Sequence, residues 1–382
     1  MKMKRHLLPF LLILFSIFCT GCSQLCKTDV EEVVLNELDL LKNLDGDTAM
    51  KYISYKELFP DATDNTELSD KIKDVFLLFF QNFDYKILDI HVDQEEKTAV
   101  ASLELSTTDA ETLAKDFRKS HLESEILLAA DAENTKADIY SLEERYLLLN
   151  DLLTSHEYET VKRDCTIELR NVGAEESQWE IVQTYSLEND LVGGLITYLS
   201  DPDILSPEDT LKVYLNTLKK MDTQEMCNYL GVSSLLNTDD DIKNEIAAAL
   251  TEQVHKNFDY EIAECTTDGY LSSIEAELTT FDSDAIMDSY QKEFNAYLSE
   301  VDAVLDGPEI RYEKSCQMLL SHIRENTAVT TATVTFTLEN DGASWKLKDN
   351  SEALGNAIFG TLSSTPTEET TEEFPEEEYS EE

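Results

Sequence analysis

Two carboxylate–phenol pairs are the residues of this sequence best suited to chemistry. Asp84 precedes Tyr85 and Asp259 precedes Tyr260, each within a repeated Asn-Phe-Asp-Tyr tetrapeptide. A carboxylate whose pKa is shifted inside a pocket can act as a general base, and a neighbouring phenol can supply a proton. The structural alternative is that the aromatic rings pack at the start of a strand while the aspartate ends the preceding helix or loop. Because repetition equally suits a packing need of the fold, we favour packing over catalysis.

Other patterns for catalysis or ligand binding are missing from the sequence. The six histidines are scattered, and no Cys/His cluster has the spacing of a zinc site. Nothing matches a phosphate-binding loop, a nucleophile elbow or a metalloprotease helix. The Asp-Gly-Asp at 45–47 lacks the further ligands of a calcium loop, and the three aspartates at 239–241 suit a helix N-terminus. We therefore expect no cofactor and no metal, and we favour a non-enzymatic protein.

The charge of the chain excludes some classes of partner. The formal net charge is −49, from 79 acidic and 30 basic residues. Such a chain is repelled by nucleic acid and by anionic lipid, so we expect no nucleic-acid partner. Solubility and self-repulsion are the simplest consequences of this charge, and a cationic partner is the alternative. Residues 363–382 hold nine glutamates and no lysine or arginine, which predicts a disordered acidic tail.

The N-terminus has the pattern of an export signal. Lys2, Lys4 and Arg5 precede an apolar run at 7–18, which is shorter than the ~20 residues of a membrane span. The following Cys-Thr-Gly-Cys at 19–22 resembles the lipobox of bacterial lipoproteins, although Cys19 stands where that family usually has leucine. The resemblance implies that residues 1–21 are a signal peptide. It also implies that Cys22 carries the acyl chains and that the protein is anchored on the outer face of the cytoplasmic membrane. A plain secretory signal and an uncleaved anchor are the alternatives.

The repeated tetrapeptide belongs to a longer internal repeat. Leu41-Lys42 aligns with Leu218-Lys219, and the only two tryptophans, Trp179 and Trp345, also align. This predicts a tether at 22–28, a first domain at 29–200, a second domain at 201–362, and the tail. The change from helical to alternating periodicity predicts N-terminal helices, a strand hairpin, a helical insertion, two antiparallel strands and a closing helix in each copy.

Several boundaries follow from caps and periodicity. We expect Asp47 to cap a helix at 48–54, separate helices at 109–122 and 124–132, a closing helix at 187–199, and one helix at 283–305. The predicted strands are 85–92, 97–106, 158–172 and 178–184, then 260–265, 270–281, 329–339 and 343–348. Repeat alignment places Cys227 opposite Met50 and Cys265 opposite Ile90. These two cysteines, with Cys165 and Cys316, are therefore expected to be free and buried, and a disulfide framework is the alternative.

The order of elements resembles the nuclear-transport-factor-2-like, or cystatin-like, α+β cone, and more narrowly the uncharacterised domains of Gram-positive lipoproteins. The resemblance rests on the turn at 45–47, residues 50–53, the Phe83-Asp84-Tyr85 segment, and the paired strands near each tryptophan. It implies a curved antiparallel sheet around a cone-shaped pocket. Some relatives are isomerases, dehydratases or hydrolases, and many only bind. We expect a membrane-tethered extracytoplasmic module that binds a small molecule, peptide, wall component or surface protein, with an enzyme as the alternative.

Overall fold

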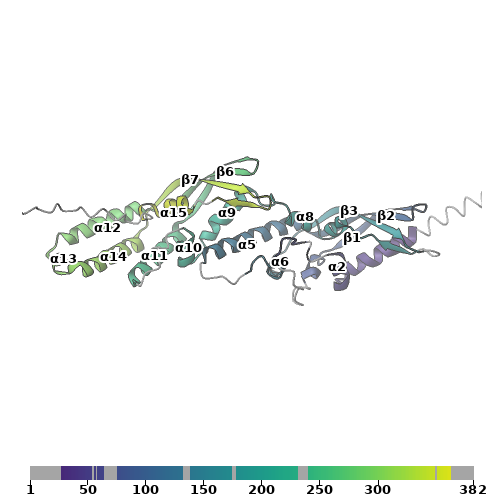
Figure 1. Ribbon diagram of the computed structural model, residues 1–382, viewed down its shortest axis with the longest axis horizontal. Helices are drawn as coiled ribbons and strands as arrows, with labels where there is room; N and C mark the ends of the chain where they lie inside the picture. Colours follow the sequence, from purple (N-terminus) through teal and green to yellow (C-terminus); the bar gives the residue numbers. More distant parts are fainter. Residues whose placement is uncertain are drawn as a thin grey trace, which may run out of the picture. The chain divides into compact units, whose positions relative to one another are not determined.

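The computed structural model describes residues 27–53, 56, 58–63, 75–131, 138–173, 178–230, 240–348 and 351–362. The predicted signal peptide, Cys22 and the predicted acidic tail lie outside these residues. Within the described residues the chain is α+β and contains two separate four-stranded antiparallel sheets, as predicted (Figure 1). It divides into two compact units. Unit 1 comprises the described residues within 1–124, 137–205 and 342–344, and unit 2 comprises those within 125–136, 206–341 and 345–382.

Unit 1 begins with a helix over residues 27–42 and continues through the first sheet. Its residues Val30, Val34, Leu38 and Leu41 are fully or almost fully buried, at the spacing of one helix face. The elements that follow are α2 (Gly46–Tyr52), α4 (Val75–Phe79), β1 (Asp84–Asp93), β2 (Thr98–Thr108), α5 (Ala110–Ala130), α6 (Leu142–Ser155), β3 (Thr160–Asn171), β4 (Trp179–Ile181), α7 (Tyr185–Leu191) and α8 (Leu195–Leu199).

Unit 2 repeats this order, with three described helices in place of two between its second and third strands. Its elements are α9 (Pro207–Leu218), α10 (Thr223–Tyr229), α11 (Asp241–Asn257), β5 (Asp259–Asp268), β6 (Leu271–Phe281), α12 (Ser283–Leu298), α13 (Val301–Leu305), α14 (Gly307–Glu325), β7 (Val329–Asn340), β8 (Trp345–Leu347), α15 (Ser351–Phe359) and the 3₁₀ turn η2 (Gly360–Leu362). Figure 1 shows α12 and α14 running alongside each other, joined by α13.

The two sheets match strand for strand. The orders are β1-β2-β3-β4 and β5-β6-β7-β8, and the strand lengths in both are 10, 11, 12 and 3 residues. Even the irregularity in the first strand recurs, between Ile87 and Asp89 in one sheet and between Ile262 and Glu264 in the other. Strand β2 buries alternate residues from Ala99 to Leu105, as the period of a half-buried strand requires.

Four expectations about helix caps and helix continuity differ from the structure. Asp45, not Asp47, caps α2, because the Thr48 N–H donates to Asp45 Oδ1 at 2.9 Å. The predicted helices at 109–122 and 124–132 form the single helix α5. The predicted helix at 283–305 breaks after Leu298, where α12 ends before α13 begins. The predicted helix at 187–199 breaks at Gly193 and Gly194, which have φ of 70° and 92°.

Glycine is needed at the break between α7 and α8. A Cβ on Gly193 would lie 2.7 Å from Thr107 Oγ1 and 2.9 Å from Thr108 O, at the end of β2. The closing segment can therefore approach the sheet only with a residue that lacks a side chain. The turn between α7 and α8 consequently depends on both the left-handed backbone and the missing Cβ.

Candidate functional site

The repeated carboxylate–phenol pairs lie at the start of β1 and of β5. Asp84 Oδ1 accepts from Lys42 Nζ at 2.7 Å, and Asp259 Oδ1 accepts from Lys219 Nζ at 3.3 Å. Lys42 and Lys219 occupy the same place in the repeat, at the end of the first helix of each unit. The structure thus forms the same ion pair twice, between a helix end and the first residue of a strand.

The aromatic residues of the motif complete this junction. Phe83 and Phe258 are only 4% and 3% exposed. The Tyr85 hydroxyl donates to Asp39 Oδ1 at 2.7 Å, and Tyr260 hydrogen-bonds Asn216, the residue at the same position of the second copy. Each motif therefore anchors a buried phenylalanine and fastens the first strand to the first helix.

The electrostatics of the junction do not suit general base catalysis. The hydrogen bond from Lys42 and the backbone N–H of Tyr85 hold the pKa of Asp84 below its ordinary value. Desolvation raises the pKa of Tyr85, so both groups keep their neutral-pH protonation states. The side chains of Asp84 and Asp259 are 60% and 80% exposed. This geometry favours the packing interpretation of Asp84, Tyr85, Asp259 and Tyr260 over a catalytic one.

A separate feature of unit 1 is a solvent-accessible cleft of about 740 Å³. It lies at the end of the sheet where Thr108 closes β2 and pairs with Thr160, which opens β3. The C-terminal ends of α4 and α6 form its other sides. Its lining is mostly hydroxyl and amide side chains, with two aromatic rings: Leu78, Gln81, Asn82, Thr108, Leu153, Thr154, Ser155, His156, Glu157, Tyr158 and Thr160. We call this the unit 1 cleft.

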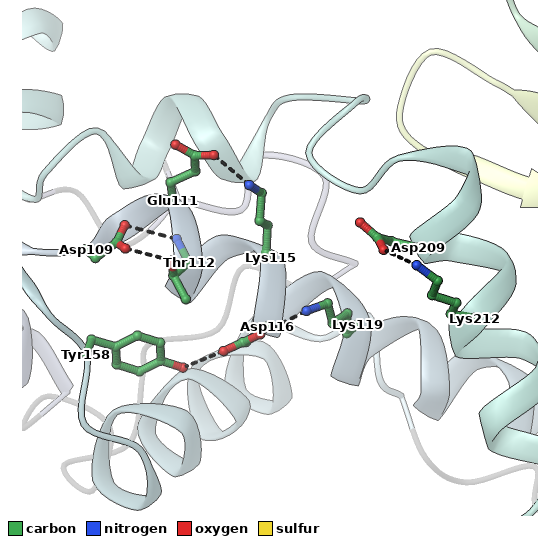
Figure 2. Close-up of polar contacts among 9 residues, drawn as sticks. All are labelled: Asp109, Glu111, Thr112, Lys115, Asp116, Lys119, Tyr158, Asp209 and Lys212. Atoms are coloured by element: carbon green, nitrogen blue, oxygen red, sulfur yellow. Dashed lines mark hydrogen bonds and ion pairs between the residues drawn. The ribbon is translucent and has the colours of Figure 1, made fainter. Parts of the chain in front are cut away.

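The loop at 156–159 is held on both sides. The backbone N–H of Asp109 donates to Glu159 O at 2.8 Å, which ties the loop to the start of α5. Asp109 also caps that helix, since its carboxylate accepts from the backbone N–H and the hydroxyl of Thr112 (Figure 2). The backbone N–H of His156 donates to Leu152 O and closes α6.

Tyr158 is oriented by α5. Figure 2 shows its hydroxyl directed at Asp116 Oδ2, 3.5 Å away, while Lys119 Nζ lies 3.3 Å from the other carboxylate oxygen. Burial and the neighbouring Asp116 raise the pKa of Tyr158 to about 12. The phenol therefore stays neutral, and its ring forms a fixed, half-buried wall of the unit 1 cleft.

In unit 2, a buried glutamine side chain lies in the region that corresponds to the unit 1 cleft. Aligned on the repeated tetrapeptide, Leu78 corresponds to Gln253 and Asn82 to Asn257. Gln253 is 4% exposed. Its amide donates to Ile323 O at 2.7 Å at the end of α14, and its Oε1 accepts from Asn257 Nδ2 at 2.7 Å. The connection to the long strand is also shorter, residues 326–328 against 156–159 in unit 1.

Sequence reasoning did not find the unit 1 cleft. Asn82 belongs to the repeated motif, but the candidate residues predicted from that motif were Asp84 and Tyr85. Neither is among the residues lining the cleft. The usable signal was the difference between the copies. At one aligned position unit 1 has the apolar Leu78 and unit 2 has the polar Gln253. The loop before the long strand is also longer in unit 1 than in unit 2.

The described cysteines are free thiols, but not all of them are buried. Cys165 and Cys227 are buried, Cys316 is intermediate and Cys265 is exposed. The expectation of a buried Cys265 is therefore wrong. Its counterpart Ile90 lies beside the start of the helix at 27–42, which Lys27 ties to Asp89 at 3.2 Å. With the lysines aligned, α9 begins three residues later than this helix, and we attribute the exposure of Cys265 to this missing turn.

Two features are missing from the part of the chain that the structure describes. No group of three or more His, Cys, Asp or Glu residues in that part of the chain is placed to hold a metal ion. No helix there combines the length and the apolar character needed to cross a membrane.

Comparisons with known proteins show little similarity. No protein-family model matches the chain, and no curated protein matches its sequence. Among solved structures, the chain is similar to a Bacillus subtilis protein described as a "putative lipoprotein (ycdA)". The two are 12% identical over 72% of this chain and 96% of that one, with a TM-score of 0.27. A likeness at this level does not carry function from that protein to this chain.

Proposed function

We propose that this protein is a lipid-anchored, extracytoplasmic binding protein without catalytic activity, and that it holds its ligand in the unit 1 cleft. The observation that carries the proposal is the cleft itself. Its volume of about 740 Å³ lies within the ~300–1,000 Å³ of ligand pockets, and its walls hold many hydrogen-bonding groups. A binding site for a specific ligand needs a few fixed polar groups and a rigid apolar surface, which the ordered loop and the Tyr158 ring supply.

The phenol of Tyr158 at the cleft is poorly suited to acid–base catalysis, which supports binding over catalysis. General acid–base catalysis requires a donor and an acceptor whose pKa values are tuned toward the working pH. The pKa of Tyr158 is about 12, well above neutral pH. The repeated Asp84–Tyr85 and Asp259–Tyr260 pairs serve the helix–strand junctions instead. The resemblance to nuclear-transport-factor-2-like domains agrees with this choice, because many members of that group only bind.

The location follows from the N-terminal sequence. Positive charge, a short apolar run and the cysteine at position 22 predict export, cleavage after residue 21 and acylation of Cys22. Each buried methylene of an acyl chain adds about 0.8 kcal/mol to membrane affinity, so several chains anchor the protein stably. The net charge of −49 repels anionic headgroups, and attachment would therefore depend on the acyl chains alone.

The anchor is tested by cell fractionation. Wild-type protein should be found with the membrane and be released only by detergent, whereas Cys22→Ser should remain as an uncleaved or soluble form without acyl chains. Mass spectrometry of the mature N-terminus identifies the cleaved residue and the attached lipid. An unmodified Cys22 on a membrane-bound protein would contradict this part of the proposal.

The binding site is tested by native mass spectrometry of the full-length protein, purified gently in detergent from a bacterial host. We expect an additional mass that disappears on unfolding. This mass should be lost in Leu78→Gln, which introduces into unit 1 the glutamine that unit 2 has at the aligned position, Gln253. The matched control is Leu305→Gln, the same substitution at an exposed site on α13. A ligand that is retained by Leu78→Gln would move the site elsewhere, and no ligand in either protein would count against tight binding.

A further inference from the structure

Two hydroxyl groups of the unit 1 cleft are arranged as hydrogen-bond acceptors. Thr154 Oγ1 donates to Asn150 O at 2.7 Å, and Ser155 Oγ donates to Asp151 O, both within α6. Each hydroxyl has one proton, so its remaining lone pairs are directed to other groups. A ligand that meets these oxygens must therefore bring donors of its own.

The imidazole of His156 follows the same pattern. Its Nδ1 lies 2.9 Å from Ser155 Oγ. Because the Ser155 proton is already donated to Asp151 O, Nδ1 must carry the proton of this contact. In the neutral ring Nε2 is then an acceptor, which again suits a ligand O–H or N–H group.

The amides of Gln81 and Asn82 supply the complementary donors. Both side chains lie on exposed residues at the rim of the cleft. Within the described part of the chain, no polar contact engages the amide of Asn82. In unit 2 the amide of Asn257 is instead bonded to Gln253. An amide offers two donors and an acceptor, so the rim can recognise groups that both donate and accept.

The charge of the described lining disfavours strongly charged ligands. Among the lining residues that the structure describes there is no lysine or arginine, and Glu157 is the one carboxylate. An anion would meet no cation there and would also be repelled by a chain of net charge −49. A multiply charged cation would find one carboxylate, where tight binding calls for several. The ligand that matches this lining is electrically neutral and rich in hydroxyl or amide groups.

The aromatic rings add an apolar surface. The rings of His156 and Tyr158 are 6.3 Å apart between centroids and inclined at 42°. Tyr158 is held by Asp116, so its ring presents a fixed face at low entropic cost. A pyranose ring has an apolar C–H face on one side and hydroxyls around its edge, and it would contact the tyrosine face and the polar rim at the same time.

We propose that the unit 1 cleft binds a neutral glycan through Asn82, His156 and Tyr158. This inference rests on the proposed function, since it assigns a ligand class to the same cleft. The cleft is accessible from solvent, so a chain of several sugars can lie along it without having to thread through the protein.

The test is titration calorimetry on full-length protein in a zwitterionic detergent without a sugar headgroup, because maltoside detergents would compete. The probes are chitotetraose, cellotetraose and maltotetraose, with inorganic phosphate as the anionic comparison. We expect at least one tetrasaccharide to bind and phosphate not to bind. Asn82→Leu and Tyr158→Leu should weaken sugar binding by about tenfold or more, equivalent to ~1.4 kcal/mol. Gln317→Leu, at an exposed site on α14, should leave it nearly unchanged. Tyr158→Phe, which keeps the ring but loses its contact with Asp116, should weaken binding less than Tyr158→Leu.

The outcomes separate the ligand class from the site. Sugar binding that is insensitive to Asn82→Leu and Tyr158→Leu would overturn the assignment of the cleft. Failure of all three tetrasaccharides, with a different copurified ligand that Leu78→Gln abolishes, would overturn the glycan class while the proposed function stands. Failure of the sugars with no ligand dependent on the cleft would overturn both. Circular dichroism on each variant confirms that loss of binding is not loss of folding.

Discussion

Gln253 offers a direct test of how the two units differ. The change is Gln253→Leu, which installs in unit 2 the apolar type of side chain that unit 1 has at Leu78. Two short hydrogen bonds are lost, from Gln253 Nε2 to Ile323 O at 2.7 Å and from Asn257 Nδ2 to Gln253 Oε1 at 2.7 Å, together with a long one from Gln253 Nε2 to Asn326 O at 3.4 Å. A typical intramolecular hydrogen bond contributes about 1 kcal/mol net, so the expected loss of unfolding free energy is ~2 kcal/mol.

The local geometry limits this loss. Asn257 Nδ2 keeps its contact with Gln253 O at 3.0 Å, and Ile323 O still accepts from the Asn326 N–H at 3.4 Å. Neither group is therefore left wholly without a partner, and a loss far above ~3 kcal/mol is not expected. The new leucine would be buried where the glutamine was, which offsets part of the lost hydrogen bonding.

The assay is equilibrium unfolding in urea, in which the midpoint should fall without a change in slope. Gln317→Leu is the matched control, because the same substitution on an exposed position should stay within about 0.5 kcal/mol of wild type. If Gln253→Leu unfolded at the wild-type midpoint, the hydrogen bonds of Gln253 would not stabilise the packing of α11 against α14. The proposed structural difference between the unit 1 cleft and the corresponding region of unit 2 would then be refuted.

Three further predictions concern other contacts. Asp61→Ala should destabilise unit 1 by ~2–4 kcal/mol, because it removes the carboxylate partner of the Arg145 guanidinium, which is only 7% exposed. Arg145→Met should cost less, and equal losses of the two variants in urea unfolding would refute this. Hydrogen bonding to Arg145 lowers the pKa of Asp61, so this contribution is full above the unfolded pKa of ~3.9 and disappears as pH falls through the folded value. Phe83→Ala should cost ~3–5 kcal/mol, whereas Lys42→Ala, which removes an exposed ion pair, should have a much smaller effect; a larger effect of the lysine would contradict the assignment of the ion pair as exposed. Cys265→Ser should remove one thiol that reacts with a disulfide reagent in the native state, whereas Cys165, buried and with its pKa raised to about 12, should react only on unfolding.

The sheets were predictable because their signals are local. Alternating apolar residues in β2, together with the aligned tryptophans and tetrapeptides, were enough to place two equivalent antiparallel sheets. The break between α7 and α8 was not expected. Two adjacent glycines weaken a helix, but only the contact of Gly193 with Thr107 and Thr108 shows that a turn is required there. The exposure of Cys265 likewise depends on where a helix from another part of the chain begins.

The candidate site was less predictable than the fold. Residues 78–82 and 153–160 are separated by about 70 positions, and few of them belong to a chemical motif. A cleft arises where side chains fail to fill a space, and a single sequence does not record that failure directly. The repeat offered an internal comparison, since Leu78 and Gln253 occupy one position with opposite polarity. The pairing of Lys42 with Asp84 and of Lys219 with Asp259 could have been anticipated in the same way.

The two tryptophans can serve as intrinsic fluorescence probes, one in each sheet. Trp179 in β4 and Trp345 in β8 are 6% and 5% exposed, and each pairs with the last residue of its long strand, Asn171 or Asn340. No other tryptophan contributes to the emission of the chain. Trp179→Phe therefore leaves a fluorophore that reports on one sheet, and Trp345→Phe leaves the other. The melting of each half can be followed separately without any added label.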